Sequence, residues 1–302
     1  MRSVPVFSRL FAVAALAAGA TASAAAGQQK TNQRFAVTPT ASIRFFGDIG
    51  SLRIVGWDRD SVVLMGALPT GARLEASRAG DPGTPSPGLK IFVEVPRSPA
   101  PDAKLELRVP ARARVWAKSG SADVEIVGLT GGVDINIVGG SVRVACSPAE
   151  LQVESMDGGV TIEGNPAWLR AKTATGDIVL RGGSEDAAMS TVSGAIRVGN
   201  GRFERARLTS VTGPIVFAGD LARAATLDLD THAGPIELRL PARSDVEFDV
   251  ATVTGTIENT FTTRRPIAGR EGRGMELGFS SGTGSGRVVV RSFKGNIHLR
   301  AR

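Results

Sequence analysis

The residue types that most often perform catalysis or bind metals are sparse in this sequence. The 302 residues include two histidines, His232 and His298, and a single cysteine, Cys146. A zinc site needs about four ligands, and His232 has Asp230 two residues away but neither a cysteine nor a second histidine near it in the sequence. We therefore interpret His232 as packed or flanking a turn. We interpret Cys146, in the alternating run SVRVACSP, as a buried and unreactive thiol.

Acidic residues recur at positions that a β-strand would present outward. These are Asp228, Asp230, Glu237, Asp249 and Glu258. A glycosidase needs two carboxyl groups about 5–10 Å apart across a cleft, but mixed outward charge is also the ordinary composition of a solvated strand face. The three tryptophans, Trp57, Trp116 and Trp168, are scattered along the chain. We predict that the protein is not an enzyme, and keep a carbohydrate-active β-helix enzyme as the alternative.

Bound calcium and phosphate cofactors are also not predicted. A calcium-binding repeat needs aspartates at one position of every repeat, so that carboxylates meet between coils. The position after the repeat glycine holds one aspartate, Asp177, among seven repeats, and no P-loop is present. The sequence predicts no catalytic residue, no cofactor and no metal site.

The most basic segment beyond the N-terminus is TTRRPIAGREGRGM, residues 262–275. Its candidate binding residues are Arg264, Arg265, Arg270 and Arg273. Repeat periodicity stops in this segment, so we expect a surface loop, either simply solvated or in contact with an anion. The formal net charge of +7 is spread along the chain and does not favour nucleic acid as a partner.

A short phrase of the form Ser/Thr-x-x-Gly-x-Ile recurs along the chain and predicts the architecture that must position these residues. TATGDIVL, TVSGAIRV, SVTGPIVF and THAGPIEL are four copies. With the phrase glycine as the reference, the repeats centre on Ala122, Gly140, Gly158, Gly176, Gly194, Gly213, Gly234, Gly255 and Gly286, and Gly295 begins a further half-unit. The spacing is 18 to 21 residues until an insertion before the last copy.

Residues at equal distances from the phrase glycine are alike. Apolar residues stand seven and five before it and two and four after it, and Ser or Thr stands three before it. This period-2 alternation indicates two strands per repeat with one buried face each, joined by a turn where glycine permits positive φ. Subsidiary turns are expected at Gly131-Gly132, Gly164-Asn165-Pro166 and Gly182-Gly183.

One repeat cannot bury its own apolar face, whereas stacked repeats can, and their like residues then form ladders. We predict an all-β fold, a flattened parallel β-solenoid of about 18–21 residues per coil. An antiparallel sandwich or prism of sequential hairpins is the alternative.

The predicted domain organisation has four parts. Residues 1–26 have a basic start, an apolar run and small-residue cleavage patterns, which is typical of a signal peptide. We expect residues 27–34 to be a flexible leader, residues 35–114 an N-terminal β region or cap, and residues 115–302 the repeat domain. Gly50 behaves as an additional phrase glycine within the N-terminal region. The protein is therefore expected to be exported to the periplasm, the cell surface or the medium, and not to be an integral membrane protein.

Three stretches together resemble the DUF4097 family of adhesin-like β-strand-repeat proteins of bacterial envelopes. They are GSLRIVGWDRDSVVLMG, LELRVPARARVWAKSGSADVEI and the run of Ser/Thr-x-x-Gly-x-Ile phrases. The resemblance covers roughly residues 35–302, with Ala122 in place of a phrase glycine and Asn259 in place of an apolar residue. It implies surface attachment, envelope sensing or a structural role, and it brings no catalytic motif.

We therefore expect an exported, non-enzymatic envelope protein that acts as an adhesin or binding scaffold. Ordered columns of Ser, Thr and charged residues would make shallow, multivalent contacts with an envelope polysaccharide or protein. A structural or stress-related envelope component without a ligand of its own is the second alternative.

Overall fold

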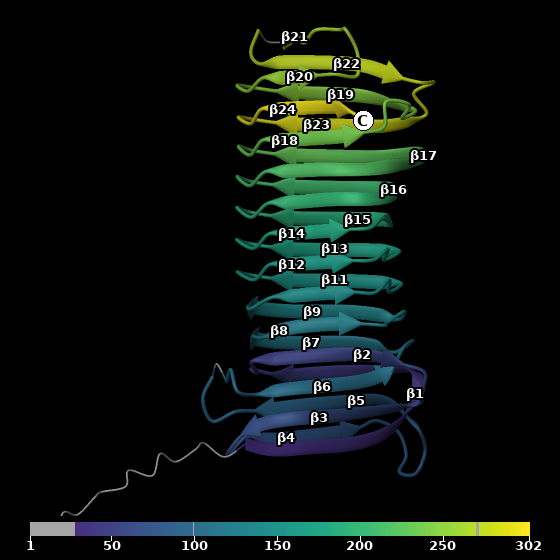
Figure 1. The fold of residues 1–302 in the computed structure, drawn as a ribbon, viewed down its shortest axis with the longest axis vertical. Helices are drawn as coiled ribbons and strands as arrows, with labels where there is room; N and C mark the ends of the chain where they lie inside the picture. The colour runs from purple at the N-terminus through teal and green to yellow at the C-terminus, as the bar shows by residue number, and fades with distance from the viewer. Residues whose placement is uncertain (1–27, 99, 270–271) are drawn as a thin grey trace, which may run out of the picture.

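The computed structural model describes residues 28–98, 100–269 and 272–302, and the signal peptide expected at residues 1–26 lies outside them. The described residues form strands and turns, with no helix. Successive coils stack into one long column, with the early strands at one end and β21 and β22 at the other (Figure 1). The expected all-β fold is confirmed.

Each coil contributes one strand before its phrase glycine and one after it. We call these two stacks of strands the first column and the second column. The regular first-column strands are β7 (Arg114–Ser121), β9 (Gly132–Gly139), β11 (Glu150–Ser155), β13 (Trp168–Thr173) and β15 (Ser184–Thr191). The regular second-column strands are β8 (Asp123–Val127), β10 (Val142–Ala145), β12 (Val160–Glu163) and β14 (Ile178–Arg181). The long strands β16 (Ile196–Ser210) and β17 (Ile215–Thr231) each pass through both columns.

Neighbouring strands within each column are parallel, and each residue pairs with the residue at the same position of the next repeat. Val142 pairs with Val160, Val160 with Ile178, and Ile178 with Ile196, each time one repeat apart. In this region the pairing is that of a parallel solenoid, and the alternative of sequential antiparallel hairpins is wrong there.

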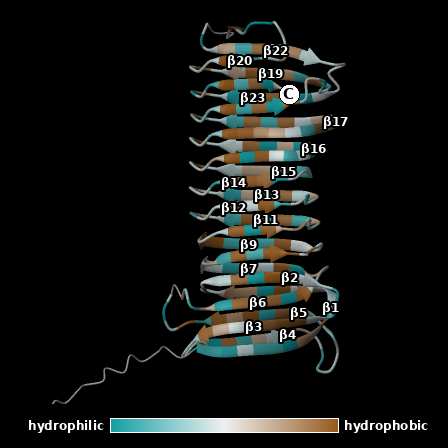
Figure 2. Cartoon of the chain, viewed as in Figure 1, coloured by the Kyte–Doolittle hydropathy of each residue, from teal (hydrophilic) through white to brown (hydrophobic). Residues whose placement is uncertain are grey.

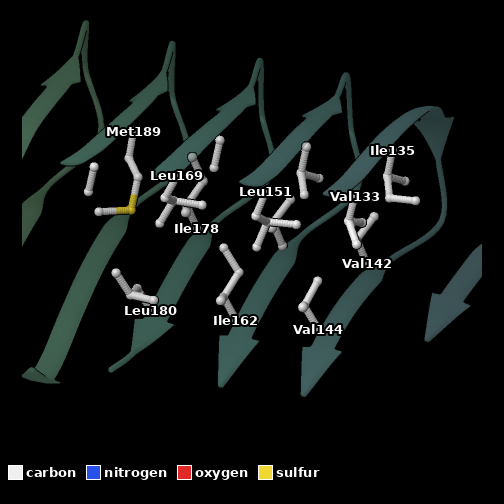
Figure 3. Close-up of a cluster of buried hydrophobic side chains, with 14 of the residues drawn as sticks. Val133, Ile135, Val142, Val144, Leu151, Ile162, Leu169, Ile178, Leu180 and Met189 are labelled. Atoms are coloured by element: carbon white, nitrogen blue, oxygen red, sulfur yellow. The ribbon is translucent and has the colours of Figure 1, made fainter. Parts of the chain in front are cut away.

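The apolar core lies between the two columns. Leu151, Leu169 and Met189 of the first column point toward Ile162 and Leu180 of the second, and all of them are buried (Figure 3). Along the whole stack, strands alternate between apolar and polar residues (Figure 2). Stacked coils therefore bury the face that a single coil would leave in water.

The phrase glycine is required because successive coils approach closely at this corner. A Cβ atom on Gly194 would lie well under 3.0 Å from the carbonyl oxygen of Gly176, and one on Gly213 would meet the carbonyl oxygen of Gly194 in the same way. The expected reason, positive φ, holds for Gly140 (φ 94°) but not for Gly194 or Gly213. The glycines are therefore selected mainly by backbone contact between coils.

The Ser or Thr three residues earlier caps several of these corners, whereas the buried hydroxyls of Ser119, Ser155 and Ser210 have no hydrogen-bond partner among the described residues. Gly194 N–H donates to Thr191 Oγ1 at 3.1 Å, and Gly234 N–H donates to Thr231 Oγ1 at 3.0 Å. Thr173 Oγ1 instead donates to the Gly176 carbonyl oxygen at 2.6 Å. Backbone groups at the buried corner are thereby paired without water, which explains why Thr and Gly recur together in the phrase.

The expected subsidiary turns lie at the opposite corner of the coil. Gly164 and Gly182 have φ of 150° and 145°. A Cβ atom on Gly182 would also overlap the carbonyl oxygen of Gly164. This second glycine stack fixes the other edge of each coil.

The N-terminal strands continue the same two columns. They are β1 (Gln28–Gly47), β2 (Ser51–Trp57), β3 (Ser61–Pro69), β4 (Arg73–Arg78), β5 (Ser86–Glu94) and β6 (Lys104–Pro110). The coil of β1 and β2 lies between the coil of β5 and β6 and the coil of β7 and β8, with parallel pairing on both sides. Gly50 forms a corner as predicted, against the backbone of Pro101. The flexible leader expected at 27–34 is wrong for residues 28–34, which pair antiparallel with β3.

The C-terminal strands are also stacked out of sequence order. They are β18 (Ile236–Leu240), β19 (Val246–Thr252), β20 (Ile257–Asn259), β21 (Ile267–Ala268), β22 (Met275–Ser281), β23 (Gly286–Ser292) and β24 (Ile297–Ala301). The last coil, β23 and β24, lies between β17/β18 and β19/β20, so the C-terminus is not at the end of the stack (Figure 1). Gly295 is its corner glycine, stacked between Gly234 and Gly255.

The interpretation of Gly286 as a corner is therefore wrong. Gly286 starts β23 and pairs with Val246, within the first column. The error arose because β22, which follows the insertion, resembles a repeat strand in sequence but pairs antiparallel with β19, with Phe279 opposite Phe248. At the other end of the stack, β4 pairs antiparallel with β5. Antiparallel strands thus terminate the first column at both ends, where bare parallel edges would invite pairing with other chains.

Asp245 organises the turn that returns the chain into the stack. Its carboxylate accepts hydrogen bonds from Ser285 Oγ at 2.8 Å, from Thr283 Oγ1 at 2.9 Å and from the Gly284 N–H at 2.8 Å. These bonds, with those of Ser285 and Thr283 first, lower the pKa of Asp245 from 3.8 to about 2. The turn between β22 and β23 is therefore held by an ionised carboxylate.

The first prediction concerns the corner glycine. Gly194→Val is expected to lower the free energy of unfolding by about 3 kcal/mol or more, because the new Cβ overlaps the Gly176 carbonyl group. Gly199→Val is the matched control: nothing lies within 4 Å of a Cβ there, and the change is expected to stay within about 0.5 kcal/mol. Denaturant unfolding of both variants checks this, and equal stabilities would refute the corner assignment.

The second prediction concerns acid. A carboxyl with a depressed folded-state pKa contributes stability that is present above its unfolded pKa and lost as pH falls through the folded value. The Tm difference between wild type and Asp245→Asn is therefore expected to be constant above about pH 4 and to shrink toward pH 2. Thermal unfolding by circular dichroism between pH 2 and 7 measures it, and a difference independent of pH would contradict the role of the charge.

Candidate functional site

The basic residues predicted as a binding site lie near the β22 end of the stack. Arg264, Arg265 and Arg273 are exposed, while Arg270 lies outside the described residues. Arg264 Nη1 donates to the Gly278 carbonyl oxygen at 3.2 Å, and Arg273 lines a separate hollow beside His232. The structure does not test whether they contact an anion, so this assignment stays a prediction.

The outward acids that suggested an enzyme mostly have cationic partners. Asp228 lies 3.0 Å from Arg207, Glu237 lies 2.9 Å from Arg239, and Asp249 is paired with Arg291. Glu258 likewise contacts His298 Nδ1 at 3.0 Å and Arg300 at 3.5 Å. Paired carboxylates of this kind are typical of a solvated charged surface.

The positions of His232 and Cys146, the remaining candidates for catalysis or metal binding, are also explained by the residues around them. His232 is exposed beside its turn and stacks on Phe293, with ring centroids 5.0 Å apart. Cys146 is half-buried, and burial raises the pKa of its thiol, which favours the unreactive protonated form. Among the described residues, no three His, Cys, Asp or Glu side chains come together as a metal site would require.

The outward face of the second column is a run of paired charges. Arg143 and Arg181 both contact Glu163, at 2.7 and 2.8 Å, and Arg197 contacts Asp177 at 2.6 Å. Each pair joins neighbouring coils and is exposed, so it contributes little to stability. This face offers few unpaired groups to a ligand.

The outward face of the first column differs at the N-terminal end of the stack, where aromatic rings gather. Trp116 packs edge-on against Phe46 with centroids 4.8 Å apart, and Phe46 lies 6.4 Å from Phe92. Lys90 Nζ lies 5.1 Å from the Phe46 ring centroid. Phe92 is 45% exposed, so this cluster presents apolar surface to solvent.

A groove of about 470 Å³ adjoins this aromatic cluster and continues along the first column to Trp168. Its lining side chains include Arg44, Arg114, Trp116, Asp134, Glu150, Gln152 and Trp168. Trp116 belongs to β7 and Trp168 to β13. Strands β9 and β11 lie between these two, so the tryptophans are three strand spacings, or rungs, apart in the first column. The groove therefore has an indole ring toward each end and polar groups between them.

Gly132 opens the middle of this groove. Its neighbours on the outward face, Arg114 in β7 and Glu150 in β11, carry long side chains, whereas Gly132 leaves a gap. The nearest atom to a Cβ there would be Arg114 Cγ at 3.4 Å, and φ is not positive. The fold would accept a side chain at residue 132, in contrast to Gly131, where a Cβ would overlap the Ala113 carbonyl oxygen.

The charges that line the groove are balanced. Arg114 Nη2 lies 3.5 Å from Glu150 Oε1, and the Arg170 guanidinium lies 4.3 Å from the Trp168 ring centroid. Asp134 accepts a hydrogen bond from Asn136 Nδ2 at 2.7 Å, yet burial and the nearby Glu154 raise its pKa above 3.8. The groove is thus polar, partly desolvated and without a strong net charge.

A row of exposed apolar residues runs beside the phrase corner, two residues before each glycine. Its most exposed members are Val138, Met156, Val192, Val211, Phe293 and Val253, with 38–56% of each side chain accessible. His232 belongs to this row and is exposed, so its interpretation as turn-flanking is confirmed and packing in the core is not its role. The row gives the edge of the first column a second apolar surface.

Sequence reasoning missed the groove because it treated the tryptophans as scattered. Trp116 is six residues before its corner residue Ala122, and Trp168 is eight before Gly176. Both positions face outward in the first column. Aligning the outward residues of the repeats, as was done for the inward ones, would have shown that the two tryptophans share one face.

Comparison with known proteins finds similarity to solved structures alone. No protein-family model and no curated protein sequence matches the chain. A Bacteroides fragilis protein provisionally named an adhesin is 14% identical, with 91% of this chain and 98% of that chain covered and a TM-score of 0.46. A Parabacteroides distasonis protein provisionally named a lipid-binding protein is 12% identical, with 89% and 96% covered and a TM-score of 0.41.

A Clostridium sporogenes protein provisionally named a cell adhesion protein is 9% identical, with 91% of this chain and 100% of that chain covered and a TM-score of 0.26. At these values the three structures support no inference about the activity or ligand of this chain. Within the described residues, no helix is long and apolar enough to cross a membrane.

The groove geometry generates a prediction about Asp134. Because burial raises its folded-state pKa, ionisation of this carboxyl costs stability above that pKa and costs nothing below its ordinary value of 3.8. Asp134→Asn keeps an acceptor for Asn136 and is expected to raise the Tm slightly at pH 7, with the gain vanishing below about pH 4. A Tm that falls at pH 7 would show that the charge stabilises the fold.

Proposed function

We propose that this chain is an exported, non-enzymatic envelope protein of the DUF4097 type that acts as a binding scaffold or adhesin. Residues 1–26 would direct export as a signal peptide, and the rest would act as one continuous solenoid. The sequence phrases support the family, and the N-terminal pattern supports export. A solenoid of stacked coils supports a rigid, extended surface suited to polymers or to large partners.

The observation that carries the proposal is the contrast between the two outward faces. The second column pairs its charges between coils, whereas the first column has an exposed Phe92 and the half-buried Trp116 and Trp168 beside an open groove. Aromatic side chains clustered at the surface of a protein favour a binding site. We therefore assign binding of an envelope polysaccharide or protein to the first column.

The alternative of a carbohydrate-active enzyme is less well supported. The acids near the C-terminal end are engaged by Arg207, Arg239 and Arg291. In the groove itself, Glu150 contacts Arg114 at 3.5 Å, and Glu154, the carboxylate near Asp134, contacts Lys172 at 3.5 Å. Neither is a free carboxylate partner for Asp134 of the kind that glycosidases use. The basic loop with Arg264, Arg265 and Arg273 stays a further proposed contact for anionic polymers.

The proposal is tested by retention on envelope material. Purified residues 28–302 are mixed at physiological salt with the insoluble envelope fraction of the organism that encodes the protein, and the sedimented fraction is measured. Wild type is expected to be retained, and Phe46→Ser with Trp116→Ser is expected to lower retention about tenfold or more.

The matched control changes the second column. Arg143→Ser with Arg197→Ser removes two exposed ion pairs on the opposite face and is expected to leave retention unchanged. Circular dichroism confirms that each variant is folded. Absence of retention by wild type, or an equal loss in the second-column variant, would refute binding through the first column.

A further inference from the structure

The groove in the first column has the features of a saccharide site, and this inference deepens the function proposed above and rests on it. We propose that the groove between Trp116 and Trp168 binds an uncharged, hydroxyl-rich oligosaccharide of several rings, with a sugar ring packed on each indole. The ligand class follows from the spacing of the indoles, the open middle of the groove and its balance of charge.

The spacing of the indoles requires an elongated ligand. Trp116 and Trp168 lie three rungs apart in one column. Since neighbouring strands are about 4.8 Å apart, the two residues are separated by about 14 Å along the stack. Trp168 is in register with Glu150 and Gly132, one side-chain position away on this face from the row of Trp116, Asp134 and Gln152. A single ring cannot touch both tryptophans, whereas a linear chain of sugars that crosses the strands diagonally can.

The aromatic rings are held in place before any ligand arrives. Trp116 packs edge-on against Phe46 at 4.8 Å, and Arg170 lies 4.3 Å from the centroid of Trp168. Fixed rings lower the entropy cost of binding. The apolar face of a sugar ring packs on an aromatic ring, while its hydroxyls need hydrogen-bond partners at the rim.

The polar groups between the indoles match such hydroxyls. Asp134 and Glu150 accept hydrogen bonds, Arg44 and Arg114 donate them, and the Gln152 amide does both. Among the described residues, neither Arg44 nor Gln152 has an ion pair or hydrogen bond of its own side chain, so both remain available.

The charges favour an uncharged chain. Two arginines and two carboxylates line the groove, and one of each already form the pair Arg114–Glu150. A polyanion would meet Asp134 and Glu150, and a polycation would meet the arginines. Apolar lipid tails would leave all of these groups desolvated without partners, which is costly.

Gly132 provides the space that the ligand would occupy. It is the outward residue between Arg114 and Glu150, and its Cβ position is free of backbone contacts. Gly132 is the first residue of β9, and nothing in the packing or the backbone conformation requires glycine there. Its presence is explained by the groove that it leaves open.

The experiment measures binding by tryptophan fluorescence in the Trp57→Phe background. The chain has three tryptophans, so this variant leaves the two groove residues as the reporters. Linear tetrasaccharides of β-1,4-linked glucose and of β-1,4-linked N-acetylglucosamine are the uncharged probes, and a tetragalacturonate is the anionic comparison. Saturable fluorescence changes are expected with at least one uncharged probe and not with tetragalacturonate.

Three variants locate the site by isothermal titration calorimetry, each against wild type. Trp168→Ala is expected to weaken affinity for the bound tetrasaccharide about tenfold or more. Gly132→Gln is expected to do the same by filling the groove, while its Tm stays near that of wild type because the new Cβ meets no backbone atom. Val211→Ala, the control, shortens an exposed apolar side chain outside the groove and is expected to leave affinity unchanged.

Several results would overturn the inference. They are absence of binding to both uncharged probes, preferential binding of tetragalacturonate, and unchanged affinity in Gly132→Gln. If wild type is still retained on envelope material in any of these cases, only the saccharide assignment fails, and the proposed scaffold function stands. If wild type is not retained either, both fail.

Discussion

The structure depends on one contact, the approach of each corner glycine to the backbone carbonyl group of the coil next to it. Gly176, Gly194 and Gly213 stack in this way with no room for a Cβ atom. The contact sets the distance between coils and aligns their registers, because each glycine must meet its counterpart. At several corners a buried hydroxyl such as Thr191 Oγ1 then accepts a hydrogen bond from the corner amide, and the apolar ladders meet between the columns. The rest of the fold follows once coils are forced into this register.

A scaffold of this kind separates stability from binding. Inward residues and corner glycines hold the coils together, so the outward residues of each coil are free to vary with little cost to the fold. In the second column they form paired charges such as Arg143 with Glu163. In the first column they bring together Trp116 and Trp168, which are far apart in sequence but only three rungs apart in space. Function is therefore expected where outward residues depart from simple charge pairing.

Much of this fold could be predicted from the repeat. The phrase glycines from Gly140 to Gly255, the buried Ser/Thr row and the corner at Gly50 were all readable as matching positions. The position of the last coil was not, because β23 pairs with β17 and β19 across long sequence separations, and the periodicity of a strand does not reveal which coil it joins. The same limit explains the misassigned Gly286 and the strand formed by residues 28–34, whose pairing partner β3 lies beyond Trp57. The groove was not predicted, because it is formed by outward residues of different coils together with a gap at Gly132.

The central claim is that the chain binds its partner through the first column while the second column faces solvent. Hydroxyl-radical footprinting, with the protein free and mixed with envelope material, tests it most directly because it reports on individual side chains. The account predicts that oxidation of Trp116 and Trp168 falls in the mixture. Three half-buried residues of the second column, Trp57 in β2, Val179 in β14 and Val216 in β17, are expected to be oxidised as in the free protein. Protection confined to the second column, or no protection of either groove tryptophan, would contradict it.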